Sequence, residues 1–164
     1  MTRRLILMRH AKSSWGAADL SDHDRPLNAR GRSSANALGA WLRARGYMPD
    51  EVLCSTAVRT QETAEGLALA APVTLLDTLY HAGPEAMMQA LRGASGRCVL
   101  MLGHNPGIAE FAYDLAATPP VHPRFAVYPT GATMVADLPI NDWAQAEERS
   151  AEVVDFVIPR EIMA

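Results

Sequence analysis

The chain has 164 residues, a formal net charge of −3 and a pI of about 5.9. We expect one domain over residues 1–164 and no general basic surface, so binding to nucleic acid or to a membrane is not expected. The apolar run Leu5 to Met8 is too short for a signal peptide, and no run reaches the ~20 residues of a membrane span, so we expect a cytoplasmic protein.

The first half of the chain alternates predicted strands and helices. The apolar run Leu5 to Met8 predicts a buried strand, which a long polar loop follows. Asn28 is a suitable N-cap for a helix that ends at Gly46. The next predicted elements are a strand over 52–54, a helix over about 57–70 that Pro72 ends, and a strand over 73–76.

The second half continues the alternation. Pro84 and Gly93 bracket a short predicted helix. Asn105 is expected to cap a helix that follows an apolar strand over 98–102. The remaining segments are a proline-rich stretch over 117–131, for which irregular structure is expected, and two strands predicted over 132–138 and 153–158.

This alternation predicts an α/β fold, a three-layer sandwich with a mostly parallel central sheet and helices on both faces. In such sheets ligands bind beyond the carboxyl ends of the strands. His10, the segment 55–59 and His104 each follow a predicted strand directly. We therefore expect one edge of the sheet to bring these residues together.

Convergence of Arg9, His10, Arg59 and His104 would create a site for a phosphoryl group. Two guanidiniums and two imidazoles supply planar donors and a nitrogen nucleophile without any permanent negative charge. The two cations should also lower the pKa of the histidine below its usual 6.5, because they disfavour imidazolium. His10 is therefore expected to be neutral and ready for attack at neutral pH.

Four segments of the chain resemble, in the same order, the histidine phosphatase superfamily, which is also called phosphoglycerate mutase-like. They read "LMRHAKSSW", "DHDRPLNARG", "VLCSTAVRTQETAE" and "LMLGHNPGI", and they look most like the SixA-type phosphohistidine phosphatase branch. The resemblance implies that His10 is transiently phosphorylated and that Arg9 and Arg59 hold the phosphoryl oxygens. It also implies that His104 completes the pocket and that neither a metal nor an organic cofactor is needed.

The chain departs from the family pattern in the loop after His10. Larger relatives have a glycine and an acidic residue where this chain has Ala11 and Lys12, so substrate contacts there cannot be carried over. Lys12 and Ser13 are our own candidates for substrate binding. The chain is also too short for the helical cap of larger relatives, so we expect an open pocket that suits a phosphorylated protein side chain or a small phosphorylated substrate. The sequence predicts no oligomeric state.

A second departure concerns the leaving group. Many relatives carry a carboxylic acid that protonates it, and here "LLDTLYHAGPEAMM" offers Asp77, His81 and Glu85 without a clear match. No general acid is therefore assigned from the sequence.

Two other classes of function stay open. A cysteine-dependent phosphatase would use "CSTAVR", but this stretch has four residues between Cys54 and Arg59 where that signature has five. Cys54 and Cys98 both lie in apolar runs, which is typical of buried, inert thiols in a reducing compartment. A phosphate-binding or scaffold protein that keeps the fold without activity is the other alternative. The hypothesis we favour is a phosphatase that acts on phosphohistidine or small phosphomonoesters through a covalent intermediate on His10.

The other charged residues and histidines of the loops are expected to serve structure. Arg25 should pair with Asp22 or Asp24 and fix the turn at Pro26. His23 and His122 lie in polar or proline-rich loops and are expected to be solvated. The spacing of the histidines does not predict a zinc site.

Overall fold

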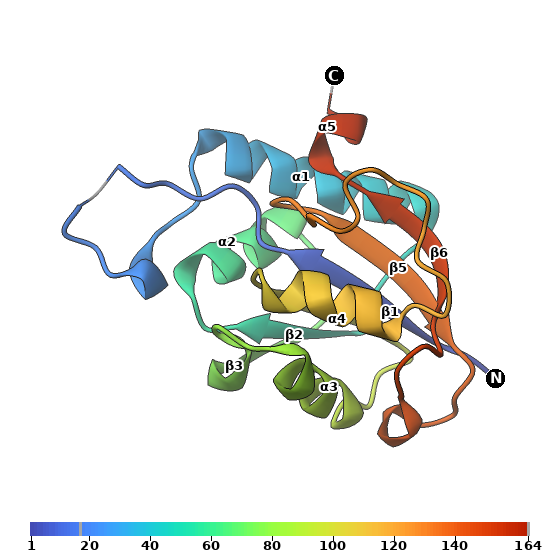
Figure 1. Cartoon of the computed structure of the whole chain (residues 1–164). Helices are drawn as coiled ribbons and strands as arrows, with labels where there is room; N and C mark the ends of the chain where they lie inside the picture. Colours follow the sequence, from blue (N-terminus) through green and yellow to red (C-terminus); the bar gives the residue numbers. More distant parts are fainter. Residues whose placement is uncertain (17, 164) are drawn as a thin grey trace.

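The computed structural model describes residues 1–16 and 18–163, and within them six strands form one sheet in the order β3-β2-β4-β1-β5-β6 (Figure 1). The first four strands in the chain run parallel, whereas β5 is antiparallel to both of its neighbours. The strands are β1 (Arg3–Arg9), β2 (Glu51–Ser55), β3 (Val73–Leu76), β4 (Cys98–Gly103), β5 (Thr133–Leu138) and β6 (Glu152–Val157). The predicted mostly parallel sheet is confirmed.

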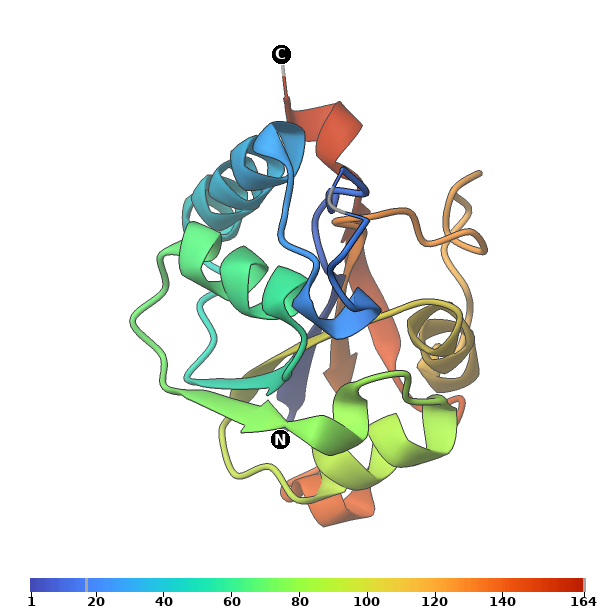
Figure 2. The same cartoon turned by 90° about the vertical axis from the view of Figure 1, so that its left-hand side faces the viewer.

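Helices cover both faces of the sheet, as Figures 1 and 2 show. One face carries α1 (Ala29–Arg45), α2 (Val58–Leu67) and the short α5 (Pro159–Ile162), and the other carries α3 (Pro84–Arg92) and α4 (Gly107–Leu115). Short 3-10 turns occur at η1 (Asp22–Asp24), η2 (Asp77–Leu79) and η3 (Trp143–Gln145). The three-layer prediction is therefore confirmed. In the described ranges, no helix is long and apolar enough to cross a membrane.

The apolar run of β1 is explained by its place between the two helical layers. Leu5 and Leu7 pack into the core beneath α3 and α4, whereas Ile6 and Met8 pack into the core beneath α1 and α2. All four side chains are fully buried, and burial of each contributes about 1.5–3 kcal/mol. A strand buried on both faces needs no polar alternation.

The ends of α1 fix the loop that precedes it. Asn28 Oδ1 accepts a hydrogen bond from the Gly31 N–H at 2.8 Å, and Gly46 ends the helix with φ +73°, as predicted. Gly31 also lies directly against the Lys12 backbone, where a Cβ would clash with the Lys12 carbonyl oxygen. The backbone two residues beyond His10 is therefore held by the first turn of α1.

The predicted end of the second helix was wrong. The second helix ends at Leu67, because Ala68 adopts a left-handed conformation and Arg43 Nη1 donates to the Leu67 carbonyl at 2.9 Å. That side chain satisfies one of the carbonyls that a helix end leaves open.

The fourth helix begins at Gly107, and Asn105 Oδ1 accepts from the Ala109 N–H in its first turn at 3.3 Å. The Asn105 side chain therefore caps this helix as predicted, although Pro106 holds the N-cap position. The Asn105 amide nitrogen also donates to the carbonyls of Val127 and Tyr128. It thereby holds the irregular 117–131 segment against the start of α4.

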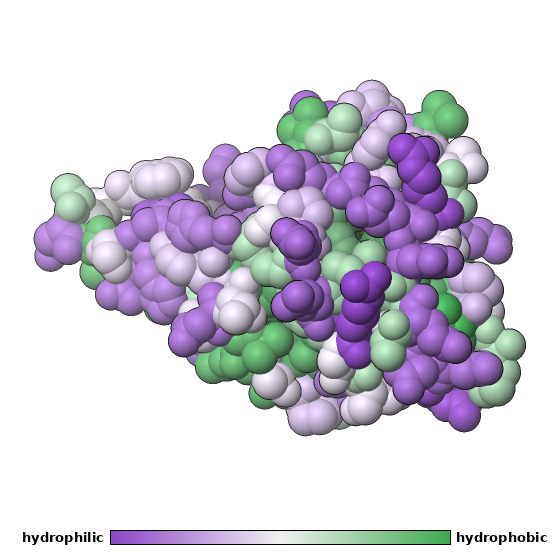
Figure 3. Space-filling view, turned by 60° about the horizontal axis from the view of Figure 1, so that its bottom comes forward, coloured by the Kyte–Doolittle hydropathy of each residue, from purple (hydrophilic) through white to green (hydrophobic). Residues whose placement is uncertain are grey.

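The loop after β1 projects from the body of the molecule, on the left in Figures 1 and 3. The face shown in Figure 3 is hydrophilic over much of its area and has a hydrophobic area toward the lower left. The projecting loop carries η1 back toward the carboxyl ends of β1 and β2, where it contacts α2. That edge of the sheet is where the candidate site lies.

Candidate active site

The residues that follow β1, β2 and β4 meet at one edge of the sheet. β4 lies between β1 and β2, so the segments that leave the carboxyl ends of these strands are neighbours. The ring centroids of His10 and His104 are 5.3 Å apart, and both residues are about 5% exposed. Arg59, in the first turn of α2, is 4% exposed and is close enough to lower the pKa of both imidazoles.

The tautomer of His10 follows from its hydrogen bond. His10 Nδ1 lies 2.6 Å from the Ala11 carbonyl oxygen, which can only accept. Nδ1 therefore carries the hydrogen, and Nε2 keeps its lone pair. The Ala11 N–H donates to Thr63 Oγ1 at 3.0 Å, which ties this turn to α2.

His104 is oriented by Ser55, a residue that the sequence analysis did not single out. His104 Nε2 lies 2.8 Å from Ser55 Oγ, and this hydroxyl also accepts from the Ala57 N–H at 3.3 Å. A serine hydroxyl can accept and donate at the same time, so its hydrogen is available for His104 Nε2. His104 Nδ1 is buried and has no hydrogen-bond partner in the described part of the chain.

Both imidazoles are neutral. Burial lowers the pKa of His10 to about 3, with smaller contributions from the charges of Arg9 and Arg59. Burial, followed by the neighbouring His10, lowers the pKa of His104 to about 3 as well. The sequence argument expected a lowered pKa for His10 but attributed it to the cations. The larger cause is desolvation, because the ring is almost wholly enclosed.

Arg9 and Arg59 bring two positive charges close together at the site. Arg9 Nη1 donates to the Tyr128 carbonyl at 3.2 Å, yet the Nε atoms of both arginines are buried without a partner among the described residues. Burial and the charge of Arg59 lower the pKa of Arg9. Two close guanidiniums, each of which disfavours the charge of the other, favour an anion nearby.

A carboxylate that the sequence analysis treated as structural lies over this site. Asp22 Oδ2 accepts from Arg59 Nη2 at 3.0 Å and from the Tyr80 hydroxyl at 2.6 Å, and Oδ1 accepts from Arg25 Nη2 at 3.1 Å. Its pairing with Arg25 was predicted, whereas its contact with Arg59 was not. The Tyr80 hydroxyl and the two guanidiniums hold the pKa of Asp22 well below its usual range. Asp22 is therefore ionised and has no proton to donate.

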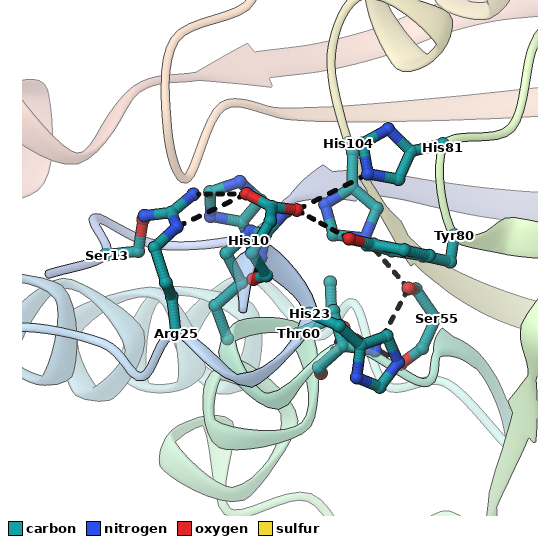
Figure 4. Close-up of polar contacts among 12 residues, drawn as sticks. His10, Ser13, His23, Arg25, Ser55, Thr60, Tyr80, His81 and His104 are labelled. Carbon is teal, nitrogen blue, oxygen red and sulfur yellow. Dashed lines mark hydrogen bonds and ion pairs between the residues drawn. The ribbon is translucent and has the colours of Figure 1, made fainter. Parts of the chain in front are cut away.

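The structure brings His81, one of the three candidate acids, to the site (Figure 4). His81 Nε2 is 3.3 Å from Asp22 Oδ2, and its ring is nearly parallel to that of His104 with centroids 6.3 Å apart. His81 has φ +56°, a left-handed conformation uncommon outside glycine. Asp77 and Glu85 are exposed, and Glu85 lines a separate pocket beside α3.

The loop candidates have different environments. Ser13 Oγ accepts from Arg25 Nη1 at 2.7 Å, so this hydroxyl is occupied within the loop. The Arg25 guanidinium also lies 3.5 Å above the Trp15 ring. Lys12 is exposed and lines a neighbouring pocket.

The expectation that His23 and His122 are merely solvated was wrong. His23 Nε2 is 3.0 Å from Thr56 Oγ1, and its ring packs edge-on against Tyr80. His122 Nε2 is 2.9 Å from Glu161 Oε2. Both partners are more than thirty positions away in the chain, so the local composition gave no signal of these contacts.

Cys54 is buried, and burial raises the pKa of its thiol to about 12. A thiol with a raised pKa is a poor nucleophile at neutral pH. Within residues 1–16 and 18–163, no group of three or more His, Cys, Asp or Glu side chains could hold a metal ion.

Comparison with known proteins identifies the class to which this fold and site belong. A family model described as the histidine phosphatase superfamily (branch 1) matches residues 5–82. An uncharacterized protein of Mycobacterium tuberculosis is 34% identical over 160 residues, which cover 93% of this chain and 100% of that protein. An uncharacterized protein of Mycobacterium leprae is 35% identical over 165 residues, with the same coverage.

Solved structures agree. A protein from Nakamurella multipartitia that carries the name phosphohistidine phosphatase SixA matches with a TM-score of 0.87 and 29% identity, over 97% of both chains. A protein of the same name from Agrobacterium tumefaciens matches with a TM-score of 0.77 and 25% identity, over 96% of this chain and 98% of that one. The chain belongs to the histidine phosphatase superfamily. Within it, the likeness is to the SixA-type branch, as the sequence predicted.

Proposed function

We propose that this protein is a phosphatase that hydrolyses phosphohistidine, or small phosphomonoesters, through a covalent phosphohistidine on His10. The observation that carries the proposal is a neutral His10 whose Nε2 keeps its lone pair, close to the guanidiniums of Arg9 and Arg59. The SixA name of the matched structures supports this choice of substrate.

In the first step, His10 Nε2 attacks phosphorus, and the bond from phosphorus to the leaving group breaks. The Ala11 carbonyl accepts from Nδ1–H and so stabilises the positive charge that the ring acquires. Arg9 and Arg59 hold the phosphoryl oxygens, each worth roughly 4 kcal/mol at 4 Å and an effective dielectric of 20. In the second step, water attacks phosphorus, and His10 leaves as neutral imidazole while inorganic phosphate departs.

In this mechanism, His104 donates a hydrogen bond to the phosphoryl group. If Ser55 donates to His104 Nε2, the other nitrogen, Nδ1, carries a hydrogen and can donate to a phosphoryl oxygen. Ser55 is then a positioning residue, since it acts only through the histidine.

Substrate must displace Asp22 from Arg59. The carboxylate occupies the Nη2 donor that a phosphoryl oxygen would take, but it lies in a loop and its side chain is 41% exposed. An incoming dianion offers more charge to the same donors, so the exchange is favourable. Asp22 thus stands in for the phosphoryl group when the site is free of substrate.

The leaving group supports phosphohistidine as the substrate. An alkyl phosphate needs a proton from a positioned acid, help that is typically worth 10²- to 10⁴-fold, and Asp22 is ionised. The ring of a phosphohistidine can leave as neutral imidazole without that help. We expect kcat/KM to fall from phosphohistidine peptides to aryl phosphates to alkyl phosphates, with His81 as the reserve acid if the order proves shallow.

The proposal is tested by trapping the intermediate. Acid-quenched turnover of a ³²P-labelled substrate should give an acid-labile, alkali-stable label on the wild-type protein and on Cys54→Ser, but not on His10→Ala. Label retained by His10→Ala and lost in Cys54→Ser would establish the thiol mechanism instead. A wild type that binds phosphate without labelling or turnover would be a phosphate-binding protein.

A further inference from the structure

We propose that a second pocket, beside the candidate active site, binds acidic residues of a phosphorylated protein substrate. This basic pocket has a volume of about 310 Å³, and its lining includes Lys12, Arg30, Arg124 and Arg160. The inference rests on the proposed function for the origin of its ligand, but its anion binding can be measured independently of catalysis.

Among the described residues, the side chains of these four cations donate no hydrogen bond to the rest of the protein. Most arginines of the chain donate side-chain hydrogen bonds to carbonyls, hydroxyls or carboxylates. In the part of the chain that the structure describes, the basic side chains that donate none are Lys12, Arg30, Arg97, Arg124, Arg149 and Arg160. Four of these line this one pocket, although the chain as a whole carries a net charge of −3.

Arg124 is the least exposed of the four cations. Its Nε atom is buried and has no hydrogen-bond partner among the described residues. A buried donor without a partner is costly, so a water molecule or an anion is expected to satisfy this guanidinium. The carboxylate next in sequence to Arg160, Glu161, is already bonded to His122 and to the Ile158 N–H.

The backbone that lines the basic pocket is hydrogen-bonded to the backbone of the candidate active site. Thr130 forms part of its wall, and the adjacent Gly131 N–H donates to the carbonyls of Arg9 and His10 at 3.1 and 2.9 Å. On the other side, the Asn28 N–H donates to the Lys12 carbonyl at 3.1 Å. A substrate that places its phosphoryl group on His10 can therefore extend into the basic pocket.

The arrangement favours an acidic peptide over a single small anion. The four cations come from four separate segments, namely the loop after β1, the first turn of α1, the 117–131 segment and α5. Lys12, Arg30 and Arg160 are exposed, so their long side chains can follow several carboxylates in succession. A chain of glutamates or aspartates near the phosphorylated residue fits this chemistry.

Binding is tested with a fluorescein-labelled hexaglutamate peptide that carries no phosphate, in the His10→Ala background. Combining Arg30→Gln with Arg160→Gln should raise the Kd about tenfold, as expected for two partly exposed ion pairs. The matched control combines Arg97→Gln with Arg149→Gln, two arginines outside the pocket. It removes the same number of positive charges and should change Kd less than twofold. Equal losses in the two variants would mean general attraction only and would overturn the proposal.

Catalysis gives the second readout. With His10 intact, the Arg30→Gln, Arg160→Gln variant should lose about tenfold in kcat/KM for a glutamate-flanked phosphohistidine peptide. Its kcat/KM should be unchanged for the glutamine-flanked peptide and for an aryl phosphate. Equal loss on all three substrates would reject a separate peptide site. If the protein binds hexaglutamate but the wild type turns over none of the three substrates, the proposed function is rejected and the proposal of an anion-binding pocket is retained.

Discussion

Lowering the pH from 7 to 5 should destabilise this protein through His10 and His104. Their folded pKa values are about 3, against an ordinary value of 6.5 that applies to the unfolded chain. Above pH 6.5 the two imidazoles are neutral in the folded and in the unfolded chain, so their full contribution to the free energy of unfolding is present. Between pH 6.5 and pH 3 the unfolded chain binds protons that the folded protein does not, so the free energy of unfolding decreases as the pH is lowered. Integration from pH 7 to 5 gives about 2 kcal/mol for each histidine, or about 4 kcal/mol for the pair.

Urea unfolding followed by tryptophan fluorescence at pH 7 and pH 5 measures this change. His10→Asn and His104→Asn should each remove about half of the pH dependence, and the double variant nearly all of it. Asp22 does not interfere, because its lowered pKa keeps it ionised in the folded state and its ordinary value of 3.8 lies below the window. A pH dependence of equal size in wild type and double variant would refute the argument that both rings are held neutral.

Three further outcomes are expected. Arg59→Lys should lower kcat/KM about ten- to a hundredfold in steady-state assays, because lysine cannot give two parallel bonds to a phosphoryl group; a change within twofold would place Arg59 outside the site. Asp22→Asn should strengthen inhibition by phosphate several-fold, since no charge then competes for Arg59, whereas weaker inhibition would show that Asp22 orients that arginine. Gly31→Ala should cost about 1–3 kcal/mol in urea unfolding, and Gly83→Ala, where a Cβ meets open space, much less; similar losses would contradict the close packing at Gly31.

The sequence predicted the elements that depend on local chemistry. The buried run of β1, the Asn28 cap and the Gly46 stop were all recognisable because each signal lies within a few residues of the feature that it specifies. The fold class followed from the alternation of such elements. Positions at strand ends then indicated which histidines and arginines would be neighbours.

The contacts across the site could not be predicted in this way. Asp22 bonds to Arg59 and Ser55 bonds to His104 over separations of 37 and 49 positions. Such pairs depend on how the loop after β1 returns over α2, which no local pattern specifies. The cause of the lowered pKa of His10 was missed for the same reason, since the depth of burial is a property of the assembled layers.

The antiparallel direction of β5 has a consequence for how new specificities can arise in this architecture. Because β5 runs antiparallel to β1, it begins at the edge of the sheet where β1 and β4 end, so the 117–131 segment arrives at the same edge as His10 and His104. His10 and His104 are buried and follow the central strands β1 and β4, whereas Lys12, Arg30 and Arg160 of the basic pocket are exposed. Substitution of these exposed side chains can therefore change the charge of the basic pocket without disturbing the buried histidines.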